Sequence, residues 1–223
     1  MITFSTNFEN FKNGLKQVLG ATSTEKTSVL SDVLLKLYDD KIELVATDGN
    51  RIRIKRLKLD ATLPEVQEPL KVVFNGEILY NQIKSFRVAD KTLKKVTSAF
   101  FEFNEEAKEV TIACPQLQLQ KTSLTIEKYT NYPKYEPLIQ RYNTSDMDFI
   151  QMLDCDANSL KVSFTAKYLL DYLKQVDKDS IVTFEIKHNM SMINLFSTLD
   201  SSLFEGLMPA QVKGVTHKQQ WGI

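Results

Sequence analysis

The sequence predicts an α+β protein whose largely antiparallel sheets carry helices on one face. Three observations support this class. One order of elements (strand, helix, strand, strand, strand) recurs three times, each helix has a single apolar face, and the strands alternate apolar and polar residues. A helix with one apolar stripe buries it by lying on a sheet. Each repeat is about 60 to 70 residues long and forms one supersecondary unit.

The first repeat starts with a short strand at 2–5. A helix follows, with Asn7 as its expected N-cap and Gly20 as its expected end. Its apolar residues recur at helical spacing: Phe8, Phe11, Leu15, Val18 and Leu19. Three strands are expected after it, at 29–38, 41–47 and 51–59. The turn between the last two, Asp48-Gly49-Asn50, favours a β-hairpin because Gly and Asn tolerate positive φ.

The second and third repeats follow connectors that lack apolar periodicity. Residues 60–69 contain Pro64 and Pro69 and predict the first connector. The second repeat has expected strands at 70–75, 95–104, 109–114 and 116–126, with a helix whose apolar residues are Ile78, Leu79, Ile83 and Phe86.

The third repeat has expected strands at 161–164, 180–188, 190–198 and 203–212, and Thr165 is the expected N-cap of its helix. The apolar residues of that helix are Leu169, Leu170, Leu173 and Val176. Residues 139–155 show little periodicity. We therefore divide the chain into a domain of two repeats at 1–138, a second and apparently shortened domain at 139–212, and a polar tail at 213–223.

Composition excludes several classes of protein. The formal net charge is zero, 43% of residues are hydrophobic and 25% are charged, as in ordinary globular proteins. No apolar run could cross a membrane, and the first residues do not form a signal peptide. Cys114 and Cys155 form no motif, which favours a reducing compartment and a cytoplasmic location. His188 and His217 have no metal-ligand spacing, and no glycine-rich phosphate loop follows a strand. We therefore expect no metal, no cofactor and no enzymatic activity.

Four stretches resemble, in the same order, motifs of the bacterial β-subunit family of DNA polymerase sliding clamps, in a short, phage-type version. They are Val45-Ala46-Thr47-Asp48-Gly49-Asn50-Arg51-Ile52, Tyr132-Pro133-Lys134-Tyr135, Val162-Ser163-Phe164-Thr165-Ala166-Lys167-Tyr168-Leu169-Leu170-Asp171 and Leu207-Met208-Pro209-Ala210-Gln211-Val212. There are departures from the family pattern. Asn50 replaces the usual His, Gln211 replaces the usual Arg, and the chain continues beyond the last motif.

The resemblance implies the DNA-clamp fold and a processivity factor that encircles duplex DNA without reading its sequence. The partners that it implies are double-stranded DNA, a DNA polymerase, a clamp loader and further copies of the chain, in the cytoplasm of the cell or of a phage host. Cations on the polar helix faces are expected to face DNA phosphates: Lys12, Lys16, Lys84, Arg87, Lys91, Lys167, Lys174 and Lys178. A hydrophobic groove for partner peptides is expected at Leu30, Thr47, Gly49, Asn50, Arg51, Ile52, Pro133, Leu138, Leu207, Met208 and Pro209.

The repeat count leaves the size of the ring open. The resemblance implies a ring in which twelve such repeats surround a hole, so three repeats per chain imply a tetramer. A reduced fourth repeat within 139–158 would imply a trimer. The single third repeat also keeps an alternative open: a clamp-like adaptor or inhibitor that binds a host clamp or polymerase without encircling DNA.

Overall fold

The computed structural model describes residues 2–25, 28–64, 68–86, 93–94, 97–104, 106–117, 120–128, 132–135, 165–186 and 192–208. Its helices are α1 (Phe8–Leu19), α2 (Gly76–Ile83) and α5 (Ala166–Leu173), and its short 3-10 turns are η1 (Val29–Ser31) and η2 (Pro115–Leu117). Its strands are β1 (Ile2–Asn7), β2 (Val33–Leu37), β3 (Lys41–Thr47), β4 (Arg51–Lys58), β5 (Leu70–Phe74), β6 (Ser98–Asn104), β7 (Glu109–Cys114), β8 (Gln120–Thr125), β9 (Glu127–Lys128), β10 (Val182–Glu185), β11 (Ile193–Ser197) and β12 (Leu203–Leu207).

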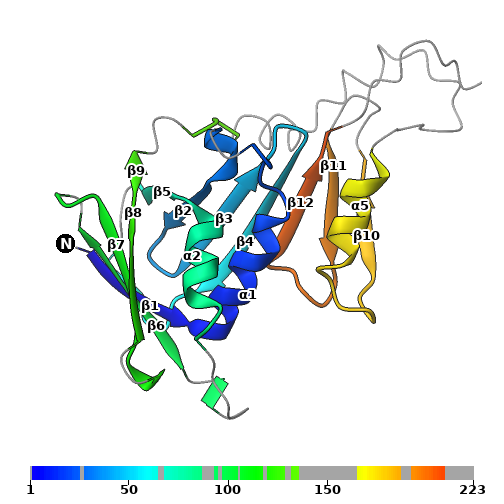
Figure 1. Ribbon diagram of the computed structural model, residues 1–223. Coiled ribbons are helices and arrows are strands. Elements are labelled where there is room, and N and C mark those ends of the chain that lie inside the picture. The colour runs from blue at the N-terminus through cyan, green and yellow to red at the C-terminus, as the bar shows by residue number, and fades with distance from the viewer. Residues whose placement is uncertain are drawn as a thin grey trace, which may run out of the picture.

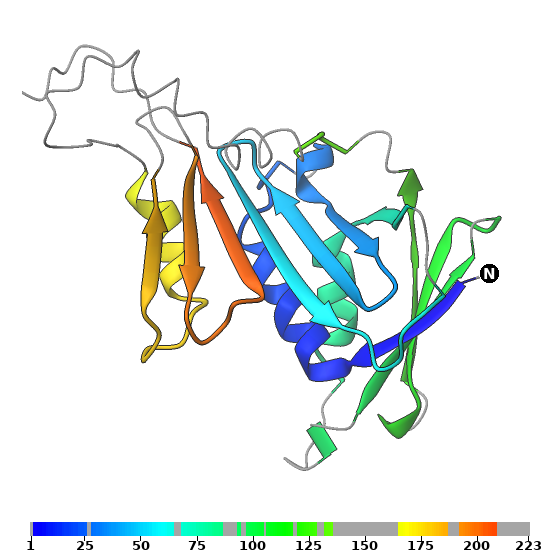
Figure 2. The ribbon, with the colours of Figure 1, turned by 180° about the vertical axis from the view of Figure 1, so that it is seen from behind.

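These strands form two antiparallel sheets. The four-stranded sheet has the order β1-β6-β7-β8, and the eight-stranded sheet has the order β10-β11-β12-β4-β3-β2-β5-β9. The helices α1, α2 and α5 lie on one side of the eight-stranded sheet (Figure 1), and within the described residues no α-helix covers its other side (Figure 2). The predicted fold class, α+β with helices on one face of antiparallel sheets, is therefore confirmed.

The first two repeats complete each other by exchanging strands. The first strand of repeat one, β1, pairs with β6 of repeat two. The first strand of repeat two, β5, pairs with β2 of repeat one. The helices α1 and α2 pack against each other, and one continuous core joins both repeats. At its centre Phe101 stacks on Phe4 with ring centroids 4.6 Å apart and meets Phe11 edge-on at 4.7 Å. Neither repeat has a closed core without the other.

The sequence patterns predicted most of the helices and strands, but some of the predicted boundaries are wrong. The expected strands at 41–47 and 109–114 have the same bounds as β3 and β7. The expected strand at 29–38 is instead η1 followed by β2, because the Ser28 side chain accepts a hydrogen bond from Leu30 N at 3.2 Å and starts a 3-10 turn. Similarly, η2 replaces the start of the expected strand at 116–126.

The helix caps show how local sequence sets a helix start. The Asn7 side chain accepts from Asn10 N at 3.0 Å, as a capping residue should. Thr165 precedes α5 but makes no side-chain capping bond.

Ile78, expected in the buried stripe of α2, is half exposed. The expected strand at 161–164, the weakly periodic stretch at 139–155 and the tail at 213–223 lie outside the described residues.

The third repeat joins the first through β12, which pairs antiparallel with β4. Arg51, Arg53 and Lys55 occupy alternate positions of β4. Their side chains therefore point to the same side of the sheet, the side on which α1 lies. Arg53 is fully buried, and its Nε donates to Glu205 Oε2 of β12 at 2.7 Å. Its Nη1 donates to the Gln17 backbone oxygen of α1 at 2.6 Å. Lys55 Nζ donates to Asp200 Oδ2 at 2.5 Å. Charged side chains of the first and third repeats therefore pair with each other on the helix side of the sheet, where β4 meets β12. We call this contact the junction.

Burial and ion pairing act in opposite directions on these carboxyls. Burial raises the pKa of Glu205, and the adjacent Arg53 and Arg51 guanidiniums oppose that rise. Burial also acts to raise the pKa of Asp200, but hydrogen bonds from Lys55 and Ser202 outweigh it, so this pKa lies below its usual value. A buried carboxylate of this kind is tolerated only with its cation, so the β4–β12 register depends on these pairs.

We predict that Arg53→Met lowers the free energy of unfolding by about 3–5 kcal/mol, because Glu205 then stays buried without its main cation. The double change Arg53→Met with Glu205→Leu should recover most of that loss, since neither member of the pair is then left buried without its partner. Urea denaturation followed by circular dichroism measures both variants. Equal losses in the single and double variants would show that the pair does not set the stability of the junction.

Candidate functional site

The hairpin between β3 and β4 is a rigid turn built by its own side chains. Asp48 Oδ1 accepts hydrogen bonds from Asn50 N at 3.0 Å and Arg51 N at 3.1 Å. Thr47 Oγ1 donates to the Arg51 backbone oxygen at 2.7 Å and accepts from Gly49 N at 3.1 Å. Gly49 has φ +88°, a conformation that side chains other than glycine rarely adopt. The local sequence alone therefore fixes this turn at one end of the eight-stranded sheet.

Residues 132–135 pack on the helix-free side of that sheet. Ile52 and Ile54 of β4 point away from the buried cations and share a cluster with Tyr132 and Tyr135. The Tyr132 hydroxyl donates to the Val45 backbone oxygen of β3 at 3.1 Å. These contacts hold the 132–135 segment against the sheet, close to the hairpin.

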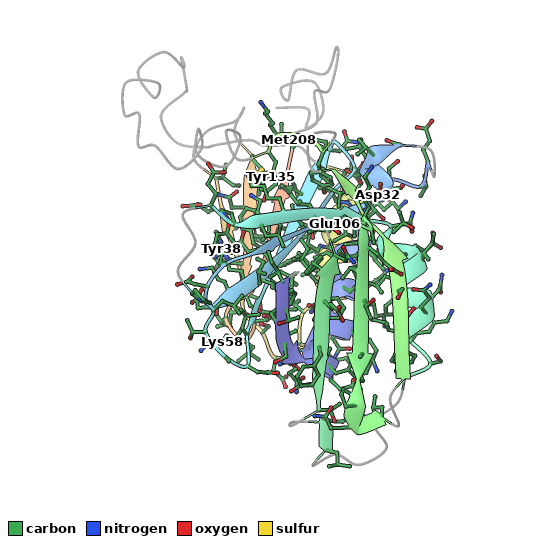
Figure 3. All side chains as sticks on the ribbon, turned by 90° about the vertical axis from the view of Figure 1, so that its left-hand side faces the viewer. Asp32, Tyr38, Lys58, Glu106, Tyr135 and Met208 are labelled. Carbon is green, nitrogen blue, oxygen red and sulfur yellow. The ribbon has the colours of Figure 1, made fainter. Side chains whose placement is uncertain are left out.

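An apolar cavity lies where the hairpin, residues 132–135 and the end of β12 meet. Its volume is about 130 Å³, and it is lined by Leu30, Thr47, Gly49, Arg51, Ile52, Pro133, Lys134, Tyr135, Met192 and Met208. Met208 N donates to the Asn50 backbone oxygen at 2.8 Å, which ties the end of β12 to the hairpin. Figure 3 labels Tyr135 and Met208 on this part of the molecule. We call this cavity the hairpin groove.

The structure brings together most of the residues that the family resemblance assigned to a groove. Asn50 and Leu207 do not line the hairpin groove. Leu207 has the same strand parity as Glu205, so it points to the helix side and is fully buried in the small core of the third repeat. Leu138 and Pro209 lie outside the described residues.

Three lining residues were missed from the sequence. Lys134 and Tyr135 follow Pro133 within the motif Tyr132-Pro133-Lys134-Tyr135, so their position in the chain could have indicated them. Met192 directly precedes β11, and nothing in the sequence around it indicated a place in the groove. It occupies the space beside Gly206, where a Cβ atom would lie 2.3 Å from Met192 Sδ. The missing side chain at Gly206 therefore lets Met192 reach the hairpin groove.

The two cations of the hairpin groove have different surroundings. The Arg51 guanidinium is nearly buried. Its Nε donates to Asp48 Oδ2 at 3.0 Å, its Nη1 donates to Asp171 Oδ2 at 3.3 Å, and it stacks over the Tyr168 ring. Lys134 is exposed, and no salt bridge within the described part of the chain involves it. The groove thus offers apolar walls with one available positive charge at its edge.

Of the cations expected to face DNA, those that the structure describes lie in or close after the helices α1, α2 and α5. Lys16 in α1, Lys84 at the end of α2, and Lys167, Lys174 and Lys178 in or after α5 are exposed. Lys12 is only partly exposed, since its Nζ donates to Glu9 Oε1 at 2.9 Å and to the Phe86 backbone oxygen at 3.2 Å. Arg87 and Lys91 lie outside the described residues. Exposed lysines therefore occur on or at the end of each of these three helices, which lie on one side of the eight-stranded sheet (Figure 1).

The described residues also bear on metal binding and on membrane insertion. Within the residues that the structure describes, no three His, Cys, Asp or Glu side chains are placed to hold a metal ion. No helix in the same residues has the length and apolar character needed to cross a membrane.

Comparisons with known proteins reveal similarity at the level of structure. No protein-family model and no curated protein sequence matches the chain. The solved structure of DNA polymerase III subunit beta from Pseudomonas aeruginosa matches with a TM-score of 0.68 and 15% identity, over 98% of this chain and 67% of that one. The DNA polymerase sliding clamp from Bacillus subtilis matches with a TM-score of 0.65 and 17% identity, over 95% and 64%.

A third structure extends the pattern. The beta subunit of the Streptococcus pyogenes DNA polymerase matches with a TM-score of 0.67 and 13% identity, over 98% of this chain and 67% of that one. The chain thus spans about two thirds of the length of the clamps it resembles, or slightly less. Identities this low establish the fold alone. The chain has the fold of the bacterial DNA polymerase III beta sliding clamps along nearly its whole length.

Proposed function

We propose that this chain is a DNA polymerase processivity factor, a sliding clamp that encircles duplex DNA as a ring of several copies. The observation that supports the proposal is the hairpin groove, an apolar cavity lined by several of the residues that the family resemblance assigns to a peptide site. A clamp needs no reacting groups, because it works by holding a polymerase and its DNA together. Its partners are duplex DNA, a polymerase and a clamp loader.

The hairpin groove suits a short apolar peptide. Leu30, Ile52 and Met208 supply apolar walls, and the unbranched Met208 side chain adapts its shape to different ligands. Peptides that enter such grooves place a few apolar anchors in the pocket. Arg51 is already neutralised by Asp48 and Asp171, so Lys134 is the cation that an incoming carboxylate would meet. We therefore propose a partner peptide with apolar anchors and an acidic flank.

The helix side suits a duplex that is held without reading its sequence. Lysines attract phosphates at any sequence, and this attraction weakens as salt concentration rises. A formal net charge of zero is compatible with this role because exposed lysines lie on or at the end of each of the three helices. The proposed duplex lies along α1, α2 and α5, on the opposite side of the sheet from the hairpin groove.

A clamp-like adaptor is the second candidate. It is favoured by one observation: among the described residues, the third repeat has no companion repeat of the kind that completes repeats one and two. Such an adaptor would bind a host clamp or polymerase as a single copy. It would share the hairpin groove but would not encircle DNA.

We predict that Leu30→Ala with Met208→Ala raises the Kd for a fluorescein-labelled peptide carrying Leu and Phe anchors and an Asp flank at least about tenfold, because both changes remove apolar wall. Fluorescence polarisation measures the affinity. Leu199→Ala, at an exposed apolar residue that does not line the groove, is the matched control and should bind like the parent. Undiminished binding by the groove variant would place the peptide site elsewhere.

We predict that Lys134→Glu reverses the preference for the charge of the flank. The parent should bind the Asp-flanked peptide up to about fivefold more tightly than a Lys-flanked peptide, and this ratio should shrink with added salt, because the pair is exposed. Lys134→Glu should prefer the Lys-flanked peptide. Lys178→Glu is the control for a change in net charge alone. If both variants behave like the parent, Lys134 does not read the flank.

A further inference from the structure

One side chain, that of Arg51, belongs both to the hairpin groove and to the packing of α5. Arg51 is among the residues that line the groove. Its guanidinium also meets two residues of α5, Tyr168 and Asp171, which lie one helical turn apart on the same face of that helix. Its Cζ lies 4.5 Å from the centroid of the Tyr168 ring, and its Nη1 donates to Asp171 Oδ2 at 3.3 Å. A residue of the proposed peptide site is therefore held in place by the helix of the third repeat.

Carboxylates join the Arg51 guanidinium to the hairpin and to β12 as well as to α5. Its Nε donates to Asp48 Oδ2 of the hairpin at 3.0 Å, and its Nη1 lies 3.9 Å from Glu205 Oε1 of β12. The Arg51 side chain is only 5% exposed, so these contacts hold its charged end beside an apolar cavity of about 130 Å³. A guanidinium that left its carboxylates and turned into this cavity would occupy the space that an apolar anchor of a peptide needs.

Asp171 is shared between Arg51 and a second cation. Its Oδ2 accepts from Arg51, and its Oδ1 lies 3.7 Å from the Nζ of Lys174, the residue that follows α5. The Lys174 side chain is 71% exposed, whereas that of Asp171 is 26% exposed. Each cation weakens the hold of the carboxylate on the other, because a charge that is already partly neutralised attracts a second cation less strongly. Lys174 is also one of the cations expected to face DNA.

We propose that Asp171 is a positioning residue of the hairpin groove and that a phosphate bound by Lys174 raises the affinity of the groove for its peptide. When Lys174 turns from Asp171 to a phosphate, Arg51 is the ion-pair partner that Asp171 keeps among the described residues, and the carboxylate holds the guanidinium more firmly. The groove then stays open for an apolar anchor, and less ordering is left for the peptide to impose. The duplex supplies the phosphate, so the inference rests on the proposed function and adds regulation to it.

The coupling between the two sides of the sheet is reciprocal and small. By thermodynamic linkage, a phosphate that tightens peptide binding is itself bound more tightly when the peptide is present, by the same factor. The Lys174 side chain is mostly exposed, so this factor is about twofold to threefold. A chain that holds a duplex on its helix side therefore binds a partner peptide in preference to a chain without DNA.

We predict that Lys174→Ala lowers the Kd for the fluorescein-labelled peptide about twofold without any DNA, because the change removes Lys174 from Asp171 as a phosphate would. Asp171→Asn should raise this Kd about threefold, and Asp171→Glu should restore part of the affinity, since Glu keeps the charge. In the Asp171→Asn background, Lys174→Ala should have no effect. Lys178→Ala is the matched control, because it removes the same charge from an exposed lysine that forms no salt bridge within the described part of the chain.

The Arg51 side chain gives a second readout that needs no peptide. In isotope-labelled protein, the arginine Nε–H signal that disappears in Arg51→Lys belongs to Arg51. Its exchange with water, measured by NMR, should slow about twofold in Lys174→Ala and become faster in Asp171→Asn, because the first change strengthens the hold on the guanidinium and the second removes it. A mere loss of stability would make exchange faster in both variants, so the opposite directions identify a positioning role.

A short DNA duplex tests the effect of phosphate directly. At low salt, with enough duplex to shift all of the protein in a native gel, the parent should bind the peptide about twofold more tightly than without duplex, and Lys174→Ala should not respond. The inference alone is overturned by a bound duplex that leaves the peptide affinity of the parent unchanged, by a Lys174→Ala effect that persists with Asp171→Asn, or by unchanged exchange at Arg51 in Lys174→Ala. A parent that binds neither peptide nor duplex contradicts the proposed function, and the inference falls with it.

Discussion

The pairing of β4 with β12 is the contact on which the rest of the structure depends. It joins the third repeat to the first across one sheet, and it places the end of β12 beside the hairpin. On the helix side this pairing is held by Arg53 and Glu205, and on the other side it closes the hairpin groove. Arg51 takes part in both, since it lines the groove and pairs with Asp171 of α5. The groove therefore exists only while the junction is intact.

The two sides of the sheet differ in chemistry because strand residues alternate. Along β4 the side chains of Arg51, Arg53 and Lys55 point toward the helices, and those of Ile52 and Ile54 point toward residues 132–135. This alternation separates a charged inner layer from an apolar outer pocket within a few residues. The proposed function uses the separation directly: exposed lysines on the helix side for a duplex, and an apolar groove on the other side for a peptide.

Local signals in the sequence were sufficient for the hairpin, for α1 with its Asn7 cap, and for the recurrence of one unit. Contacts between distant segments were beyond them. Arg53 lies in an alternating strand and looks like a solvent-facing cation, yet it is fully buried because Glu205, far away in the sequence, meets it. Met192 reaches the hairpin groove only because Gly206 leaves room. Leu170 and Leu173 fit a buried stripe, but a stripe does not show whether anything covers it.

Encirclement of DNA is the central claim, and the form of the DNA tests it most directly. The protein is loaded onto nicked circular plasmid with a clamp loader, isolated by gel filtration in salt high enough to suppress phosphate contacts, and the plasmid is then cut once with a restriction enzyme. The account predicts that the protein stays with the circle and leaves once the plasmid is linear. Equal retention on both forms, or none on the circle, would contradict a ring around DNA and favour the adaptor.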